Sequence, residues 1–140
     1  MTSGNSVDYE EMLHDVLEQN AQTPIYKMLY DEWNATSWTQ QAVAQGLNLV
    51  PMSQSLGSFN RGSKSLEIFM NNDNIIIDNN PVVRWCFTNA TLKVDSFGNI
   101  KPIKPALSKK IDCLIASIEA LSGYLFEQLF GNMEIITLPQ

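Results

Sequence analysis

The fold of this chain is decided by the stretch Ile25-Tyr26-Lys27-Met28-Leu29-Tyr30-Asp31-Glu32-Trp33-Asn34. Residues 25–30 are apolar enough for a short strand, and Asp31 begins a turn into a helix that we expect to stop at Gly46. A second strand is predicted over residues 47–52. Strands that alternate with helices in this way predict an α/β layer fold.

The rest of the chain continues the alternation, without an internal repeat or an interdomain linker. We expect a first helix capped by Ser6 and ending near Asn20, then, after the two strands, a loop over residues 53–62 and a helix capped by Ser63 with Leu66, Phe69 and Met70 inward. A strand over residues 75–77 should follow, and then a helix from Asn80 and Pro81 to Asn89. The last elements are a hairpin of residues 91–95 and 100–104 around Gly98 and a helix from Ser108. We therefore expect residues 1–140 to form one domain.

Composition supports a globular protein. The chain has 140 residues, of which 44% are hydrophobic and 17% charged, enough to bury a core. No apolar run approaches the roughly 20 residues of a membrane span, and the N-terminus does not resemble a signal peptide, so we expect a soluble intracellular protein. Cys86 and Cys113 occupy apolar helix positions, which favours small buried hydrophobes over a disulfide or a metal pair.

Charge is distributed unevenly along the chain. The net charge is −6, but residues 61–112 hold eight bases against five acids, whereas residues 1–60 hold one base against seven acids. Clustered Lys and Arg favour nucleic-acid binding, and a solvated basic face is the alternative. The basic residues of this segment are Arg61, Lys64, Arg84, Lys93, Lys101, Lys104, Lys109 and Lys110.

Two other chemistries find little support. Residues 57–65 resemble a phosphate-binding loop, but Ser63 separates the second glycine from Lys64, so the spacing is wrong. His14 is the only histidine, so the chain has too few histidines for a typical zinc site and little support for a histidine-based catalytic triad.

Asp31 and Asp112 are the candidate metal ligands. Asp31 ends an apolar strand, where α/β folds gather their sites, and Asp112 lies near the start of an apolar helix, whose macrodipole stabilises a carboxylate. Carboxylates suit Mg²⁺ or Mn²⁺, and two such ions can assist phosphodiester cleavage. Ala116 would leave room for a ligand and Glu119 would extend the site. A helix cap at Asp31 and a purely electrostatic role for Asp112 are the simpler alternatives.

Eight motifs follow in order along nearly the whole chain: Gly4-Asn5-Ser6-Val7-Asp8-Tyr9, Tyr30-Asp31-Glu32-Trp33-Asn34, residues 59–67, Asn80-Pro81-Val82-Val83-Arg84-Trp85, Asn89, Gly98-Asn99-Ile100-Lys101-Pro102, Lys110-Ile111-Asp112 and Ala116. Together they resemble the C-terminal nuclease region of the large terminase subunit of tailed bacteriophages. The resemblance implies an RNase H-like fold and a metal-dependent endonuclease that cuts concatemeric viral DNA during packaging. It also implies that Asp31 and Asp112 are the second and third acids of the metal site.

The same resemblance implies that part of the family's protein is missing here. The first acid lies upstream of this chain, Asp8 belongs to a helix start and does not replace it, and the packaging ATPase is absent. We therefore expect a partial fold without its opening strands. The chain would be a fragment, a split gene product or a truncated prophage remnant, with weak or no nuclease activity alone. The exposed edge of strand 25–30 would pair with the missing portion or with a second copy. Other implied partners are double-stranded DNA, the small terminase subunit and the portal protein, in the host cytoplasm.

Two other functions fit the same residues. Another RNase H-like nuclease or recombinase would share Asp31 and Asp112. A non-catalytic DNA-binding or assembly module would keep the basic segment and tolerate loss of either aspartate. The candidates for contact with DNA phosphates, under each of these hypotheses, are Lys101, Lys104 and Arg84.

Overall fold

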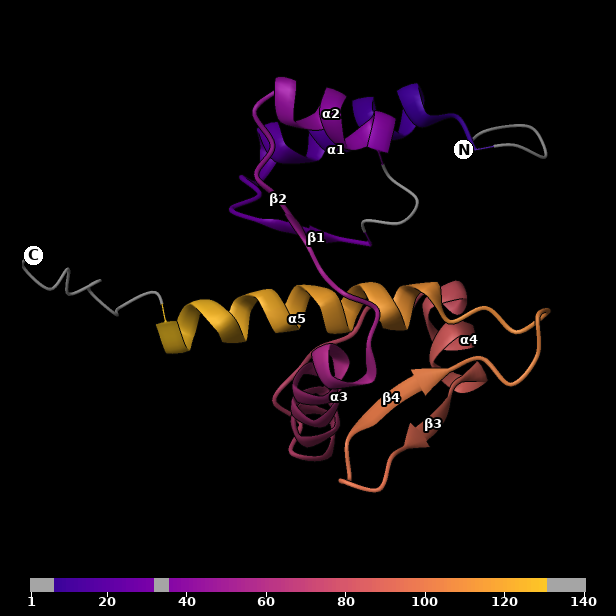
Figure 1. The fold of residues 1–140 in the computed structure, drawn as a ribbon. Coiled ribbons are helices and arrows are strands. Elements are labelled where there is room, and N and C mark those ends of the chain that lie inside the picture. The colour runs from indigo at the N-terminus through magenta and orange to yellow at the C-terminus, as the bar shows by residue number, and fades with distance from the viewer. Residues whose placement is uncertain (1–6, 32–35, 131–140) are drawn as a thin grey trace, which may run out of the picture. The chain divides into compact units, whose positions relative to one another are not determined.

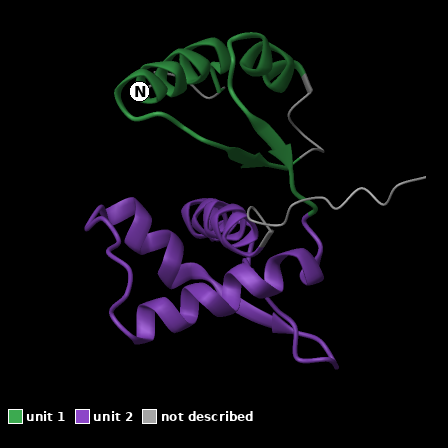
Figure 2. Ribbon diagram, turned by 90° about the vertical axis from the view of Figure 1, so that its left-hand side faces the viewer, with its two compact units in different colours: residues 1–53 green, residues 54–140 purple. Residues whose placement is uncertain are grey.

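The computed structural model of the chain describes residues 7–31 and 36–130, and Figure 1 labels its helices and strands. The chain divides into two compact units (Figure 2). Unit 1 is residues 1–53 and unit 2 is residues 54–140.

Unit 1 contains a short parallel strand pair joined by a helix. Its elements are α1 (Tyr9–Gln22), β1 (Met28–Tyr30), α2 (Thr36–Ala44) and β2 (Leu49–Pro51). Met28 pairs with Leu49 and Tyr30 with Pro51. Parallel strands need a crossover connection, which α2 supplies. This confirms the predicted strand, helix and strand, although both strands are shorter than expected.

The core of unit 1 is built from one face of each helix. Leu13 of α1 packs with Trp38 and Ala42 of α2 and with Leu47, and Met28 of β1 contacts this cluster. After α2, Gly46 adopts φ +89°, a left-handed conformation that suits glycine and ends the helix as predicted.

The predicted Ser6 cap is wrong. The carboxylate of Asp8 caps α1, because its Oδ1 accepts hydrogen bonds from the backbone N–H groups of Glu10 and Glu11 at 3.0 and 3.1 Å. An acid is well placed there, since the N-terminus of a helix carries partial positive charge. Asp8 therefore does belong to a helix start, as the motif implies, and Ser6 lies outside the described residues.

Unit 2 packs three helices and a hairpin. Its elements are α3 (Leu56–Asn71), α4 (Pro81–Asn89), β3 (Thr91–Val94), β4 (Ile100–Ile103) and α5 (Asp112–Phe130). Helix α3 packs against α5 and β4, and α4 packs against α5 (Figure 1). Phe59 of α3 and Ile118 of α5 are the largest fully buried side chains.

The predicted loop over residues 53–62 is wrong, because α3 starts at Leu56 with Ser55 as its cap. Ser63 is an interior helix residue and not a cap. Burial explains the difference: Phe59, Gly62 and Leu66 lie on the inner face of α3, and tertiary packing outweighs the weak helix propensity of the Ser and Gly residues. Met70, expected to point inward, is exposed.

Residues 75–77 form no strand, which makes that prediction wrong, and Ile76 is 98% exposed. The predicted α4 is confirmed, with Asn80 as cap and Pro81 in the first turn. The hairpin is also confirmed: Thr91 pairs with Ile103 in antiparallel register, and Gly98 has φ +76°.

The last helix begins at Asp112 and not at Ser108. Lys109 N donates to Ala106 O at 3.0 Å in a turn before the helix, and the first bond of the helical kind runs from Ile115 N to Ile111 O. The carbonyl of Lys110, just before the helix, accepts a hydrogen bond from the side chain of Asn89 at 3.0 Å. Asp112 is the first helical residue.

Candidate functional site

Asp31 follows β1 directly and is half-buried. The hydrogen bonding between the two strands extends to this point, because Met52 N donates to Tyr30 O at 2.9 Å. Both strands of a parallel pair end at the same edge, so Asp31 lies at the carboxyl edge of β1 and β2. This is the position that the sequence predicts for a metal-binding carboxylate.

Asp112 lies at the first residue of α5 and its side chain is exposed. The macrodipole of this 19-residue helix favours a negative charge there. An exposed carboxylate is accessible to a hydrated divalent cation, and its oxygens are the ligands that Mg²⁺ prefers. Asp31 belongs to unit 1 and Asp112 to unit 2, so the sharing of one ion by both stays a prediction.

The three predicted phosphate-binding residues differ in their surroundings. Lys104 is exposed just after β4. Arg84 of α4 is exposed, and its Nη1 donates to Asn79 Oδ1 at 3.1 Å. Lys101 of β4 is half-buried: its ammonium donates to the carbonyl of Gln54 and lies 4.5 Å from the ring centroid of Phe59.

Lys101 therefore has a structural role that the sequence did not reveal. Its contacts join β4 to the start of α3, and a second bond does the same, from Ile100 N to Asn60 Oδ1 at 3.0 Å. Glu119, expected to extend the metal site, is half-buried on α5 and accepts a hydrogen bond from Gln54 Nε2 at 2.7 Å.

Both cysteines are free thiols at the contact of α4 with α5. Cys86 is 2% exposed and Cys113 is half-buried. The hydrogen bond between the two thiols, together with burial, raises the pKa of Cys113. A thiol with a raised pKa is a poor nucleophile, which agrees with the interpretation of both residues as small core side chains.

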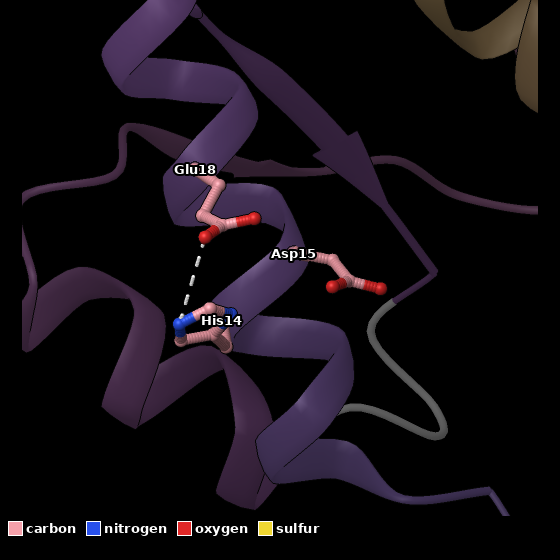
Figure 3. Close-up of side chains that lie close together, drawn as sticks. All are labelled: His14, Asp15 and Glu18. Atoms are coloured by element: carbon pink, nitrogen blue, oxygen red, sulfur yellow. Dashed lines mark ion pairs between the residues drawn. The ribbon is translucent and has the colours of Figure 1, made fainter. Parts of the chain in front are cut away.

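A cluster absent from the predicted sites lies on the exposed surface of α1 (Figure 3). His14, Asp15 and Glu18 each offer one ligand atom, and these atoms lie within 4.8 Å of one another. His14 Nε2 is 3.9 Å from Glu18 Oε1. The i,i+4 spacing of His14 and Glu18 was the available signal. Exposed groups of this kind commonly lie close together on a helix surface without a metal, and we interpret the cluster as part of the solvated face of α1.

Asn89, one of the positions of the family resemblance, makes a contact that the sequence did not indicate. It ends α4, is 7% exposed, and donates from Nδ2 to Lys110 O at 3.0 Å. Its partner lies 21 residues further along the chain.

Comparison with known proteins assigns the arrangement to a class. The crystal structure of the HK97 bacteriophage large terminase superposes with a TM-score of 0.77 at 28% identity, over 87% of this chain and 26% of that one. The large terminase nuclease from thermophilic phage G20c, solved with bound magnesium, gives a TM-score of 0.65 at 15% identity, over 84% of this chain and 63% of that one. The fold is that of an RNase H-like nuclease, with a partial sheet, as expected.

Sequence comparison gives the family. Residues 3–127 match the model of the terminase large subunit, endonuclease domain. The large terminase subunit of Enterobacteria phage HK97 is 30% identical over 132 residues, 91% of this chain, and protein YmfN of Escherichia coli (strain K12) is 29% identical over the same share. This chain belongs to the terminase large subunit endonuclease family, which confirms the resemblance seen in its motifs.

The match covers only part of those relatives. The chain spans 26% of the length of the HK97 subunit and 29% of that of YmfN. Within residues 7–31 and 36–130, no helix has the length and apolar character that crossing a bilayer demands.

Proposed function

We propose that this chain supplies Asp31 and Asp112 to the metal site of a DNA endonuclease that cuts concatemeric viral DNA during genome packaging. The observation that carries the proposal is the position of the two residues in the fold: Asp31 directly follows β1 at the carboxyl edge of the parallel pair, and Asp112 is the first residue of α5. In this proposal residues 1–140 form the C-terminal part of the nuclease domain.

The donor set fits Mg²⁺ or Mn²⁺. Both candidates are carboxylates, one exposed and one half-buried, and hard divalent cations take oxygen ligands and keep several waters. Support comes from the related G20c nuclease, whose structure was solved with magnesium. When bound, such ions activate water and stabilise the leaving oxygen of a phosphodiester. The resemblance implies three acids in the site, of which this chain supplies two at matched positions, so we expect weak cleavage by the chain alone.

The residues of this chain have separate tasks in the proposed reaction. Asp31 and Asp112 would hold the cation through their carboxylate oxygens. Lys104 and Arg84 contact backbone phosphates, which orients the duplex without reading its sequence. Lys101 is proposed for the same contact, in addition to its bond to Gln54.

The proposed setting is the cytoplasm of a bacterial host, with double-stranded DNA, the small terminase subunit and the portal protein as partners. Among the described residues β1 pairs with β2 alone, so each strand of this sheet leaves an edge for further pairing. We propose that this edge receives the remaining part of the nuclease sheet, and that a homodimer is the alternative occupant.

Plasmid nicking tests the proposal. Supercoiled DNA is incubated with the purified chain in Mn²⁺, beside Asp31→Ala, Asp112→Ala and an EDTA control, and DNA retention on a filter is measured in parallel. We expect slow nicking that EDTA and either substitution abolish, with DNA retention unchanged. Nicking that persists in EDTA or in both variants would contradict the proposal.

The filter assay distinguishes the proposed nuclease from the non-catalytic DNA-binding alternative. If the wild-type chain shows neither nicking nor Mn²⁺ binding yet retains DNA, and both aspartate variants retain it equally, the chain is a DNA-binding module and the proposed metal site is wrong. Mn²⁺ binding without nicking, lost in both variants, supports a metal site that is completed by further residues.

A further inference from the structure

The first turn of α5 is held on both sides of Asp112 by residues of α4. On the N-terminal side, Asn89 donates from Nδ2 to the carbonyl oxygen of Lys110 at 3.0 Å. On the C-terminal side, α4 carries the buried Cys86 and packs against α5, which carries Cys113. Cys86 and Asn89 are three residues apart, so they lie on the same face of α4.

The residues around this contact are mostly buried: Asn89 is 7% exposed, Cys86 2% and Ile111 7%, and Cys113 is half-buried. Asp112 itself is exposed. The carboxylate therefore projects from a backbone segment that is fixed on either side, while the side chain remains accessible to solvent.

Asn89 bonds the backbone just before α5 begins. The carbonyl of Lys110 accepts from Asn89, and the next carbonyl, that of Ile111, accepts the helical bond from Ile115 N at 3.0 Å. Asp112 is the first residue of the helix, the point at which backbone N–H groups and the macrodipole favour a negative charge. The bond from Asn89 therefore ties the segment directly preceding Asp112 to α4.

We propose that Asn89 is a positioning residue for the Asp112 carboxylate: it fixes the start of α5 so that this carboxylate is preorganised to bind a divalent cation. The inference rests on the proposed function. Residues that orient metal ligands through hydrogen bonds typically change metal affinity by about 10- to 100-fold when they are removed.

Amide resonance broadening by Mn²⁺ measures the effect without an activity assay. The ¹H–¹⁵N spectrum of the full chain is titrated with Mn²⁺, and the broadening of the Ile111 and Cys113 amides gives the dissociation constant. Wild type is compared with Asn89→Ala and Asp112→Asn. We expect Asn89→Ala to weaken Mn²⁺ binding by about 10-fold and Asp112→Asn, which removes a ligand, to weaken it more strongly.

Asn60→Ala is the matched control, because Asn60 also makes one bond to the backbone, at Ile100 N, within the same unit. A purely structural role for Asn89 predicts equal losses of affinity in Asn89→Ala and Asn60→Ala, and that result would overturn the inference. If Asn89→Ala fails to fold, Asn89→Ser replaces it, since the shorter hydroxyl does not reach Lys110.

The outcomes separate the two proposals. Wild-type binding that Asp112→Asn weakens and Asn89→Ala leaves unchanged overturns the positioning role alone. No saturable broadening at Ile111 and Cys113 in the wild type overturns the proposed metal site, and the positioning role with it.

Discussion

Gly62 of α3 lies directly against Ser122 of α5, with no room for a β-carbon between them. A β-carbon built on Gly62 would clash with Ser122 Oγ and come within 2.9 Å of Ile118 Cγ2 and 3.0 Å of the Ile118 carbonyl. Ser122 is not free to turn away without loss, because its hydroxyl donates to Ile118 O at 2.7 Å. The glycine thus permits the close approach of the two longest helices of unit 2.

Gly62→Ala is expected to destabilise the fold by about 1–3 kcal/mol through overpacking, although alanine favours helix. Gly57→Ala is the control: Gly57 also lies in α3, but a β-carbon there meets nothing within 4 Å. We expect that variant to gain about 0.5–1 kcal/mol. Urea denaturation followed by circular dichroism measures both, and equal stability of the two variants would show that the helices do not approach as described.

Ser63→Ala is expected to stabilise the protein. The hydroxyl of Ser63 is buried with no hydrogen-bond partner, and an unpaired buried hydroxyl costs about 1–3 kcal/mol. Ser117→Ala is the comparison, because it makes the same change in a helix but removes a bond from Ser117 Oγ to Cys113 O at 2.8 Å. Thermal unfolding should give the higher midpoint for Ser63→Ala, and the reverse order would contradict the assignment.

Asp95 should make the hairpin sensitive to acid. Its side chain accepts from Asn99 Nδ2 and from the backbone N–H groups of Asn99 and Phe97, each at 2.9 Å. These bonds, that of the Asn99 side chain foremost, hold the pKa of Asp95 below the ordinary 3.8. A lowered folded-state pKa means that the stabilisation is present above pH 3.8 and is lost as pH falls through the lower folded value.

Carbon-detected NMR titration of the Asp95 carboxyl tests this pH dependence. In the wild type the midpoint should lie below 3.8, and in Asn99→Ala it should rise toward that value. A midpoint at or above 3.8 in the wild type would contradict the proposed network.

Lys104 and Lys101 should respond differently to substitution. Lys104→Ala removes an exposed charge, so we expect weaker DNA binding, a salt slope smaller by about 0.9, and unchanged stability. Lys101→Ala also breaks the contacts with Gln54 and Phe59, so stability should fall as well. Fluorescence anisotropy with labelled duplex across a salt series, beside urea denaturation, measures both effects. A Lys104→Ala variant with wild-type salt dependence would remove Lys104 from the DNA contact.

The sequence predicted an element correctly where the residues of that element determine its conformation. Asn80 and Pro81 start a helix through their own backbone and cap chemistry, and Gly46 and Gly98 take positive φ in the structure as turns require. The start of α3 was mispredicted because its Ser and Gly residues favour a loop locally, while Phe59 and Gly62 are helical by virtue of packing against distant elements. The apolar run at residues 75–77 pairs with no strand among the described residues and does not itself form one.

The same distinction between local and distant determinants applies to the candidate site. The elements that carry Asp31 and Asp112 were predicted from apolar patterns, and both residues lie at the expected ends of those elements. The bond from Asn89 to Lys110 was not predictable, because it joins residues 21 positions apart. Whether Asp31 and Asp112 meet depends on the placement of the two units, which no local pattern encodes.

A double-mutant cycle on Mn²⁺ affinity tests the central claim that Asp31 and Asp112 hold the same cation. Isothermal titration calorimetry gives the dissociation constant for the wild-type chain, Asp31→Asn, Asp112→Asn and the double variant. A shared ion predicts strong coupling, so that the double variant binds about as weakly as either single variant. Independent, additive losses, or wild-type affinity in Asp31→Asn, would contradict the account.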